Sequence, residues 1–151
     1  MAIVVRGVGH VVLKVSDLAP ALAFYCDSLG LQEVARGDFG DGTMVFLSTG
    51  RNHHDIALVE VGPAARRPGP TDIGLYHVAL KIGDTLDELR GAREQLRERG
   101  VAVQWIADHG VSQSIYIADP DGNNVELFVD ASPEVWRRDP SAVAQAAALE
   151  L

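Results

Sequence analysis

The chain has 151 residues, of which 47% are hydrophobic and 23% charged, ordinary values for one globular domain that exclude a disordered or collagen-like protein. Its 13 Lys and Arg against 21 Asp and Glu give a formal net charge of −8, which disfavours nucleic acid and anionic lipid as partners. The lone Cys26 cannot form an internal disulfide, no apolar run could span a bilayer, and the N-terminal MAIVVRGVGH lacks signal-peptide features. We therefore expect a cytoplasmic protein that binds neither nucleic acid nor membranes.

The sequence contains one internal repeat. The segment GHVVLKVSDL, with its histidine at position 10, matches YHVALKIGDT, with its histidine at position 77, at one constant offset. Each histidine opens an apolar run rich in β-branched residues, of strand length and composition.

The same order of elements follows both runs. Asp17 is expected to cap a helix that stops at Gly30, and Asp84 to cap a more polar helix that stops at Gly100. Three strand-like runs come after each helix, at 31–36, 43–49 and 54–61, and again at 101–107, 113–118 and 124–129. Each copy is therefore expected to have the element order βαβββ, which predicts an α+β fold of two tandem modules forming a cupped mixed sheet.

We expect a single domain over residues 1–151, divided as module 1 (3–62), a Pro- and Gly-rich linker (63–70), module 2 (71–130) and an alanine-rich helical tail (132–151). The linker is long enough for modules to pair within one chain or to exchange between two. Apolar tail residues such as Trp136 favour a homodimer whose interface includes the tail.

Three motifs together resemble one known family. The paired HVxLK strand starts, the FYCDSLGL segment and the DPDGNNVELF segment are similar to the vicinal oxygen chelate superfamily of glyoxalases, extradiol dioxygenases and related resistance proteins. The resemblance covers residues 7–130. It implies that both modules curl their sheets around one metal cleft, with His10, His77 and Glu126 at the matching ligand positions.

The chemistry of these three residues supports a metal. Two imidazoles and a carboxylate form the facial set that suits non-haem Fe(II) and leaves positions open for substrate and dioxygen. Strand alternation puts Glu126 on the face opposite its neighbours Val125 and Leu127, where a charge inside a barrel needs a partner. Each residue alone would more simply be structural, but the trio favours Fe(II), with Mn(II) or another divalent metal as alternatives.

Two further segments, HHDIAL and DHGVSQSIYIADPDGNNVEL, resemble stretches of extradiol dioxygenases that carry an acid/base histidine and an active-site His and Tyr. These roles would fall on His54, His109 and Tyr116. A hairpin turning through 119–123 would also place Tyr116 opposite Glu126, on the same face. The plainer alternatives are a core aromatic for Tyr116 and a solvated loop residue for His109.

The position in module 1 that matches Glu126 is Ala57, so the fourth protein ligand of glyoxalase I sites is missing. This favours an extradiol ring-cleavage dioxygenase that acts on a small aromatic vicinal diol with dioxygen. One alternative is an isomerase, epimerase, lyase or thiol transferase of the glyoxalase or fosfomycin-resistance kind, using another metal at the same trio. The other is a non-catalytic ligand-binding protein of the bleomycin-resistance type.

Overall fold

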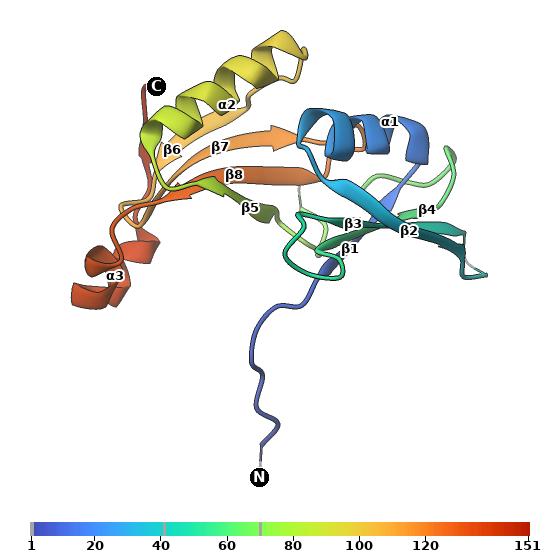
Figure 1. Ribbon diagram of the computed structural model, residues 1–151, viewed down its shortest axis with the longest axis horizontal. Helices are drawn as coiled ribbons and strands as arrows, with labels where there is room; N and C mark the ends of the chain where they lie inside the picture. Colours follow the sequence, from blue (N-terminus) through green and yellow to red (C-terminus); the bar gives the residue numbers. More distant parts are fainter. Residues whose placement is uncertain (1, 41, 70) are drawn as a thin grey trace. The chain divides into compact units, whose positions relative to one another are not determined.

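The computed structural model describes residues 2–40, 42–69 and 71–151, and the chain divides into two compact units, Met1–Arg67 and Pro68–Leu151. Each unit has its own mixed sheet and its own main helix (Figure 1). The boundary between the units lies within the segment expected to be a linker. The α+β fold class and the βαβββ order of both copies are confirmed.

The first unit is a four-stranded sheet with the strand order β1-β4-β3-β2. Strands β1 and β4 run parallel and the other pairs are antiparallel. Helix α1 continues directly as a π-helical segment, η1. The bounds of these elements are β1 Val11–Val15, α1 Leu18–Leu22, η1 Ala23–Ser28, β2 Gln32–Asp38, β3 Thr43–Ser48 and β4 Ile56–Glu60.

The helix of the first unit begins and ends where the sequence indicates. The Asp17 side chain accepts a hydrogen bond from the Ala19 amide at 2.8 Å, which caps α1. The chain leaves the helix at Gly30, whose φ of +78° lies in the region that favours glycine. The buried side chains of the helix include Phe24 and Tyr25, packed edge to face, and those of the sheet include Val45 and Leu47.

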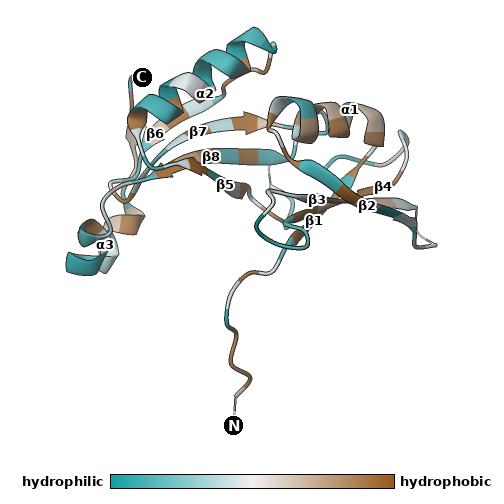
Figure 2. Cartoon of the chain, viewed as in Figure 1, coloured by the Kyte–Doolittle hydropathy of each residue, from teal (hydrophilic) through white to brown (hydrophobic). Residues whose placement is uncertain are grey.

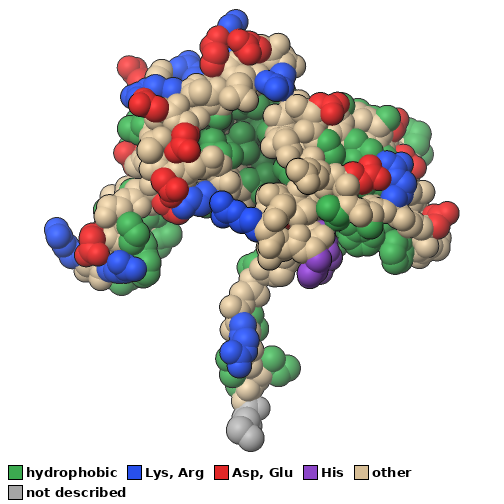
Figure 3. All heavy atoms as spheres, in the orientation of Figure 1, with side chains coloured by type: hydrophobic (Ala, Val, Ile, Leu, Met, Phe, Trp, Pro, Cys, Tyr) green, Lys and Arg blue, Asp and Glu red, His purple; other side chains and the backbone are tan. Residues whose placement is uncertain are grey.

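The second unit is a five-stranded sheet with the strand order β5-β8-β7-β6-β9. Helix α2 packs on β5, β7 and β8, burying Leu89 and Leu96, while its other side is charged (Figures 2 and 3). The bounds of these elements are β5 Val78–Gly83, α2 Leu86–Glu98, β6 Trp105–Asp108, β7 Ser112–Ala118, β8 Asn124–Asp130 and β9 Ala147–Ala148.

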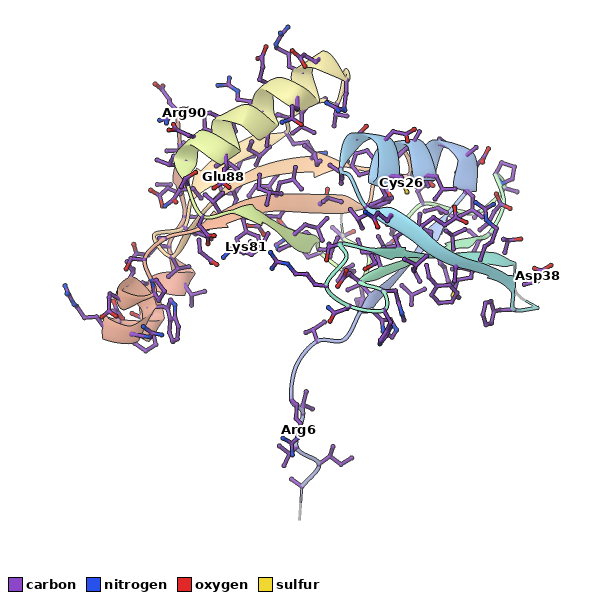
Figure 4. The ribbon with its side chains drawn as sticks, in the orientation of Figure 1. Arg6, Cys26, Asp38, Lys81, Glu88 and Arg90 are labelled. Atoms are coloured by element: carbon purple, nitrogen blue, oxygen red, sulfur yellow. The ribbon has the colours of Figure 1, made fainter. Side chains whose placement is uncertain are left out.

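Two boundaries around α2 differ from the expected ones. The N-cap is Thr85 rather than Asp84, because Thr85 and Glu88 form a reciprocal capping box, with Glu88 labelled in Figure 4 near the start of the helix. The next strand begins at Trp105 rather than at residue 101. The Val101 amide donates to Leu96 O at 2.9 Å, so this residue closes the helix instead of opening the strand.

The expected helical tail is wrong in its second half. Residues Glu134–Arg138 form α3 and Pro140–Ala144 form the 3-10 segment η2, but Ala147–Ala148 form β9, which pairs antiparallel with β6. The Leu149 amide extends this pairing by donating to Ile106 O at 3.2 Å. The intrinsic helix preference of alanine is small. Hydrogen bonding to the unpaired backbone groups on the open edge of β6 is more favourable than this preference.

Alternation sorts the side chains of the second sheet onto two faces. Ile115, Ile117, Val125, Leu127 and Val129 are almost completely buried with the helix residues. Ser114, Tyr116, Glu126 and Phe128 have the opposite parity and point to the other face. Within the described ranges, no helix is both long and apolar enough to cross a membrane.

Candidate metal centre and active site

Glu126 is a buried carboxylate in the middle of β8, with only 7% of its surface exposed. Its Oε2 lies 3.0 Å from His77 Nε2, and its Oε1 accepts a hydrogen bond of 2.5 Å from Ser114 Oγ. A buried carboxylate is costly without such partners, so these contacts explain how the sheet accommodates the charge.

His77 reaches this carboxylate because of strand register. Strand β5 pairs parallel with β8, and Ala79 lies opposite Glu126. His77 comes two residues earlier than Ala79 and therefore points to the same face. Its Nδ1 is buried and has no hydrogen-bond partner in the described part of the chain. An imidazole nitrogen and a carboxylate oxygen that converge in this way are suitable donors for a divalent transition metal.

Tyr116 and His109 form a second pair on the same face. Tyr116 lies directly opposite Glu126, as the hairpin through 119–123 predicts, and its hydroxyl is 2.8 Å from His109 Nε2. Burial and the neighbouring Glu126 carboxylate raise the pKa of Tyr116 to about 12, because both disfavour the phenolate. Trp105 stacks on the Tyr116 ring with the centroids 5.2 Å apart.

A cavity of about 390 Å³ lies beside these side chains in the second unit. Its walls are His77, Ala79, His109, Val111, Ser112, Tyr116, Glu126, Phe128 and Val143. A larger recess of about 520 Å³ lies beside α2, where Arg90 (labelled in Figure 4), Arg93 and Arg97 are engaged with Asp87, Leu151 and Glu94. Of these two recesses in the described part of the chain, the smaller one contains an imidazole and carboxylate pair, so it is the candidate site.

In the first unit, His10 and His54 lie together. Their ring centroids are 4.3 Å apart, and His54 also lies edge-on to Phe46 at 5.2 Å. His53 Nδ1 is 2.6 Å from His54 Nδ1. Partial burial, followed by the nearby His10 and His53, lowers the pKa of His54 below its ordinary value, because each of these disfavours the charged ring.

A short loop holds His54 in place. The Asp55 carboxylate accepts hydrogen bonds from the Thr49 amide at 2.7 Å, from Thr49 Oγ1 at 2.8 Å and from Asn52 Nδ2 at 2.9 Å. These bonds lower the pKa of Asp55, since they favour the ionised form. The loop from β3 to β4 is thereby ordered next to the histidine.

The predicted trio is divided between the two units, with His10 in the first and His77 and Glu126 in the second. The structure brings His77 and Glu126 together, Tyr116 and His109 together, and His10 and His54 together. Among residues 2–40, 42–69 and 71–151, no group of three or more His, Cys, Asp or Glu side chains is close enough to hold a metal ion. A complete three-ligand centre therefore remains a prediction.

Two contacts of the site were not predicted from the sequence. Ser114, which donates to Glu126, could have been found from parity, because it lies two residues before Tyr116 on one strand. The main-chain carbonyl of Gln145, 2.9 Å from His109 Nδ1, gives no signal in the sequence because every residue has such a carbonyl.

Comparisons with known proteins identify relatives of this chain. A family model described as Glyoxalase/Bleomycin resistance protein/Dioxygenase superfamily matches residues 7–127. The chain is 33% identical to a catechol-2,3-dioxygenase of Bacillus subtilis, covering 87% of this chain and 44% of that protein. It is 37% identical to biphenyl-2,3-diol 1,2-dioxygenase 3 of Rhodococcus globerulus, covering 83% and 65% respectively. The chain thus spans less than two thirds of the length of these relatives.

Two shorter proteins match over almost their whole length. A probable lactoylglutathione lyase of Synechocystis is 28% identical, covering 82% of this chain and 95% of that protein. A solved glyoxylase/bleomycin resistance protein/dioxygenase domain from Frankia has the same fold, with a TM-score of 0.73 and 22% identity over 86% of this chain and 96% of that one. The chain belongs to the glyoxalase, bleomycin resistance protein and dioxygenase superfamily.

Proposed function

We propose that this chain is a metal-dependent extradiol dioxygenase that opens the ring of a small aromatic vicinal diol. The observation that carries the proposal is the shared face of the second sheet, where the His77 and Glu126 pair lies beside the Tyr116 and His109 pair. The similarity to dioxygenases that act on catechol and biphenyl-2,3-diol supports the same substrate class.

Fe(II) is the metal that we propose, with Mn(II) or another divalent ion as the alternative, held by His10, His77 and Glu126. The donor set of two imidazoles and one carboxylate suits non-haem Fe(II). When bound, the metal would bring the diol and dioxygen together and allow electrons to pass between them. The second unit already offers one nitrogen and one oxygen donor that converge.

The other residues act on protons. Tyr116, whose pKa is raised to about 12, keeps its proton at neutral pH, and its neutral hydroxyl oxygen can accept a hydrogen bond from a substrate hydroxyl. His54, whose pKa is lowered, is neutral there and can accept the proton of a diol hydroxyl at Nε2, the ring nitrogen that does not face His53. His109 supports Tyr116 through the bond to its hydroxyl.

One observation favours a second function. The chain is also 28% identical to the probable lactoylglutathione lyase over 82% of its residues, so lyase chemistry is the second candidate. Against this candidate, the position that corresponds to Glu126 in the first sheet is Ala57, which has no ligand atom. An isomerase, lyase or thiol transferase would work without dioxygen, so oxygen dependence separates the two functions.

The test is to load the purified chain with Fe(II) without air, add a panel of catechols, and then admit oxygen. A dioxygenase consumes oxygen and forms a coloured ring-opened product, and the same trial with Mn(II) identifies the preferred metal. Binding of a diol with no oxygen uptake across the panel would instead favour a non-catalytic ligand-binding protein. Turnover of a hemithioacetal without oxygen would favour the lyase.

We also propose a cytoplasmic homodimer. The lone cysteine and the acidic composition support the location. The exposed apolar side chains of the tail, Trp136 at 49% and Val143 at 65%, support self-association. Light scattering on the full-length chain tests the dimer, and a monomer at micromolar concentration would contradict it.

A further inference from the structure

We infer that the C-terminal segment 139–149 belongs to the active site, because the main-chain carbonyl of Gln145 fixes the position of the proton on His109. The inference deepens the proposed function and depends on it for the role of Tyr116. Gln145 is here a positioning residue, which acts on Tyr116 through the His109 ring.

The bonding around His109 determines its tautomer. Nδ1 lies 2.9 Å from Gln145 O, and Nε2 lies 2.8 Å from the Tyr116 hydroxyl. A carbonyl oxygen only accepts, so Nδ1 must carry the proton and donate it. A neutral imidazole has one such proton, which leaves Nε2 as an acceptor for the Tyr116 hydroxyl. The Gln145 carbonyl oxygen in the tail thereby determines that the Tyr116 hydroxyl donates its proton to His109 Nε2.

The carbonyl of Gln145 is held from both sides. Before it, the Asp139 side chain caps η2 by accepting from the Ser141 amide at 3.0 Å, and Ala142 is buried with 5% exposure. After it, β9 pairs with β6 through Ala107 and Ala148 and through Asp108 and Ala147. The segment therefore crosses the His109 loop in a fixed position.

The loop and the tail also approach each other closely at Gly110. Its φ is +73°, and a Cβ at this position would lie 3.4 Å from the Gln145 side-chain oxygen. Val143 from the same tail segment lines the cavity together with His77 and Glu126. Two separate contacts thus place the tail at the site. Gln145 contacts the His109 ring, which is hydrogen-bonded to Tyr116, and Val143 forms part of the cavity wall.

The ring tautomer can be measured without any enzyme assay. Long-range nitrogen–proton NMR spectra of the full-length chain, free of paramagnetic metal and at a pH where the ring is neutral, distinguish Nδ1–H from Nε2–H for each of the five histidines. We expect Nδ1–H for His109, and a ring that is mainly Nε2–H in the wild-type chain would overturn the inference.

The Leu149→Pro variant tests whether the tail is the cause. It removes the amide that donates to Ile106 O and should release β9, so that His109 shifts toward Nε2–H, the form that an unconstrained ring favours in water. Glu150→Pro, one residue beyond, is the matched control and should leave the tautomer unchanged. If Leu149→Pro does not fold, Ala142→Arg displaces the segment at its buried residue instead. Hydrogen exchange of the Asp108 and Ala147 amides shows whether β9 has been released in a folded variant. If these amides exchange freely while His109 keeps its Nδ1–H signal, the inference is contradicted.

The tautomer measurement on His109 does not depend on whether the chain has dioxygenase activity. A chain that shows the expected tautomer but has no dioxygenase activity would refute the proposed function and leave the Gln145 contact in place. An active dioxygenase with an Nε2–H ring would refute this inference alone.

Discussion

The two sheets share one register but have different chemistry at the matching positions. In the first sheet, Ala57 lies between Val12 on β1 and Phe46 on β3. In the second, Glu126 lies between Ala79 on β5 and Tyr116 on β7. The same backbone therefore presents an apolar set on one copy and a carboxylate with a phenol on the other. The repeat determines which positions share a face, while single residue types determine which copy supplies the carboxylate.

The largest expected effect comes from removing the carboxylate that distinguishes the second sheet. Glu126→Ala should abolish tight metal binding and turnover, because a facial site has no spare protein ligand, and His10→Ala and His77→Ala should do the same. Asp130→Asn, on the same strand, is the matched control, since its carboxylate pairs with Lys81 instead. Elemental analysis measures the metal, and full occupancy in any of the three ligand variants would contradict the assignment.

The next effect separates proton handling from metal binding. His54→Ala and Tyr116→Phe should keep the metal but lose turnover by about 10²-fold, the usual scale for a positioned acid or base. Steady-state rates and metal content on the same samples provide the check. Wild-type rates in both variants would leave the metal prediction intact and rule out the proposed roles of these two residues.

Introducing a carboxylate into the first sheet sharpens the comparison. Ala57 is fully buried, and Phe46 is its neighbour on β3, so Ala57→Glu should lower the free energy of unfolding of the metal-free chain by about 2–4 kcal/mol. Ala57→Leu separates the effect of bulk from that of charge, and Val12→Glu adds the same charge at a position that is 48% exposed. Chemical denaturation gives the values, and equal stabilities for Ala57→Glu and Val12→Glu would contradict the account.

The helix caps provide a smaller test. Thr85→Ala removes the hydroxyl of the capping box of α2 and should lower the free energy of unfolding by about 1 kcal/mol. Thr85→Ser retains the cap and serves as the control. Asp84→Asn should have little effect, since Thr85 rather than Asp84 caps the helix; a larger loss for Asp84→Asn than for Thr85→Ala would contradict this.

The smallest expected effect is a pH dependence in the first unit. The folded-state pKa of Asp55 is below the unfolded value of about 3.9, so its bonds stabilise the fold above that pH and are lost as the pH falls through the folded value. The stability difference between the wild-type chain and Asp55→Asn should therefore shrink on acidification. Asp38→Asn, at the exposed end of β2 (Figure 4), is the control for the loss of a surface charge.

Much of this arrangement was predictable from local patterns. The repeat can be read directly from the sequence, and the Asp17 cap and the turn through 119–123 are short-range signals. Together they placed Tyr116 opposite Glu126 and Ala57 at the matching position. The tail was not predictable in the same way. Its alanines favour a helix locally, but Ala147 and Ala148 pair with the open edge of β6. This edge exists only once the sheet has formed, so no local sequence pattern indicates it.

The most direct test of the central claim is to supply isotopically labelled dioxygen to the Fe(II)-loaded chain with a catechol and to analyse the product by mass spectrometry. Extradiol cleavage breaks the ring bond beside the two hydroxyl carbons and adds both oxygen atoms of one dioxygen molecule to the product. We predict a ring-opened product that carries both labelled atoms, and none from Glu126→Ala. A product without label, or complete conversion of substrate in the absence of oxygen, would contradict the account.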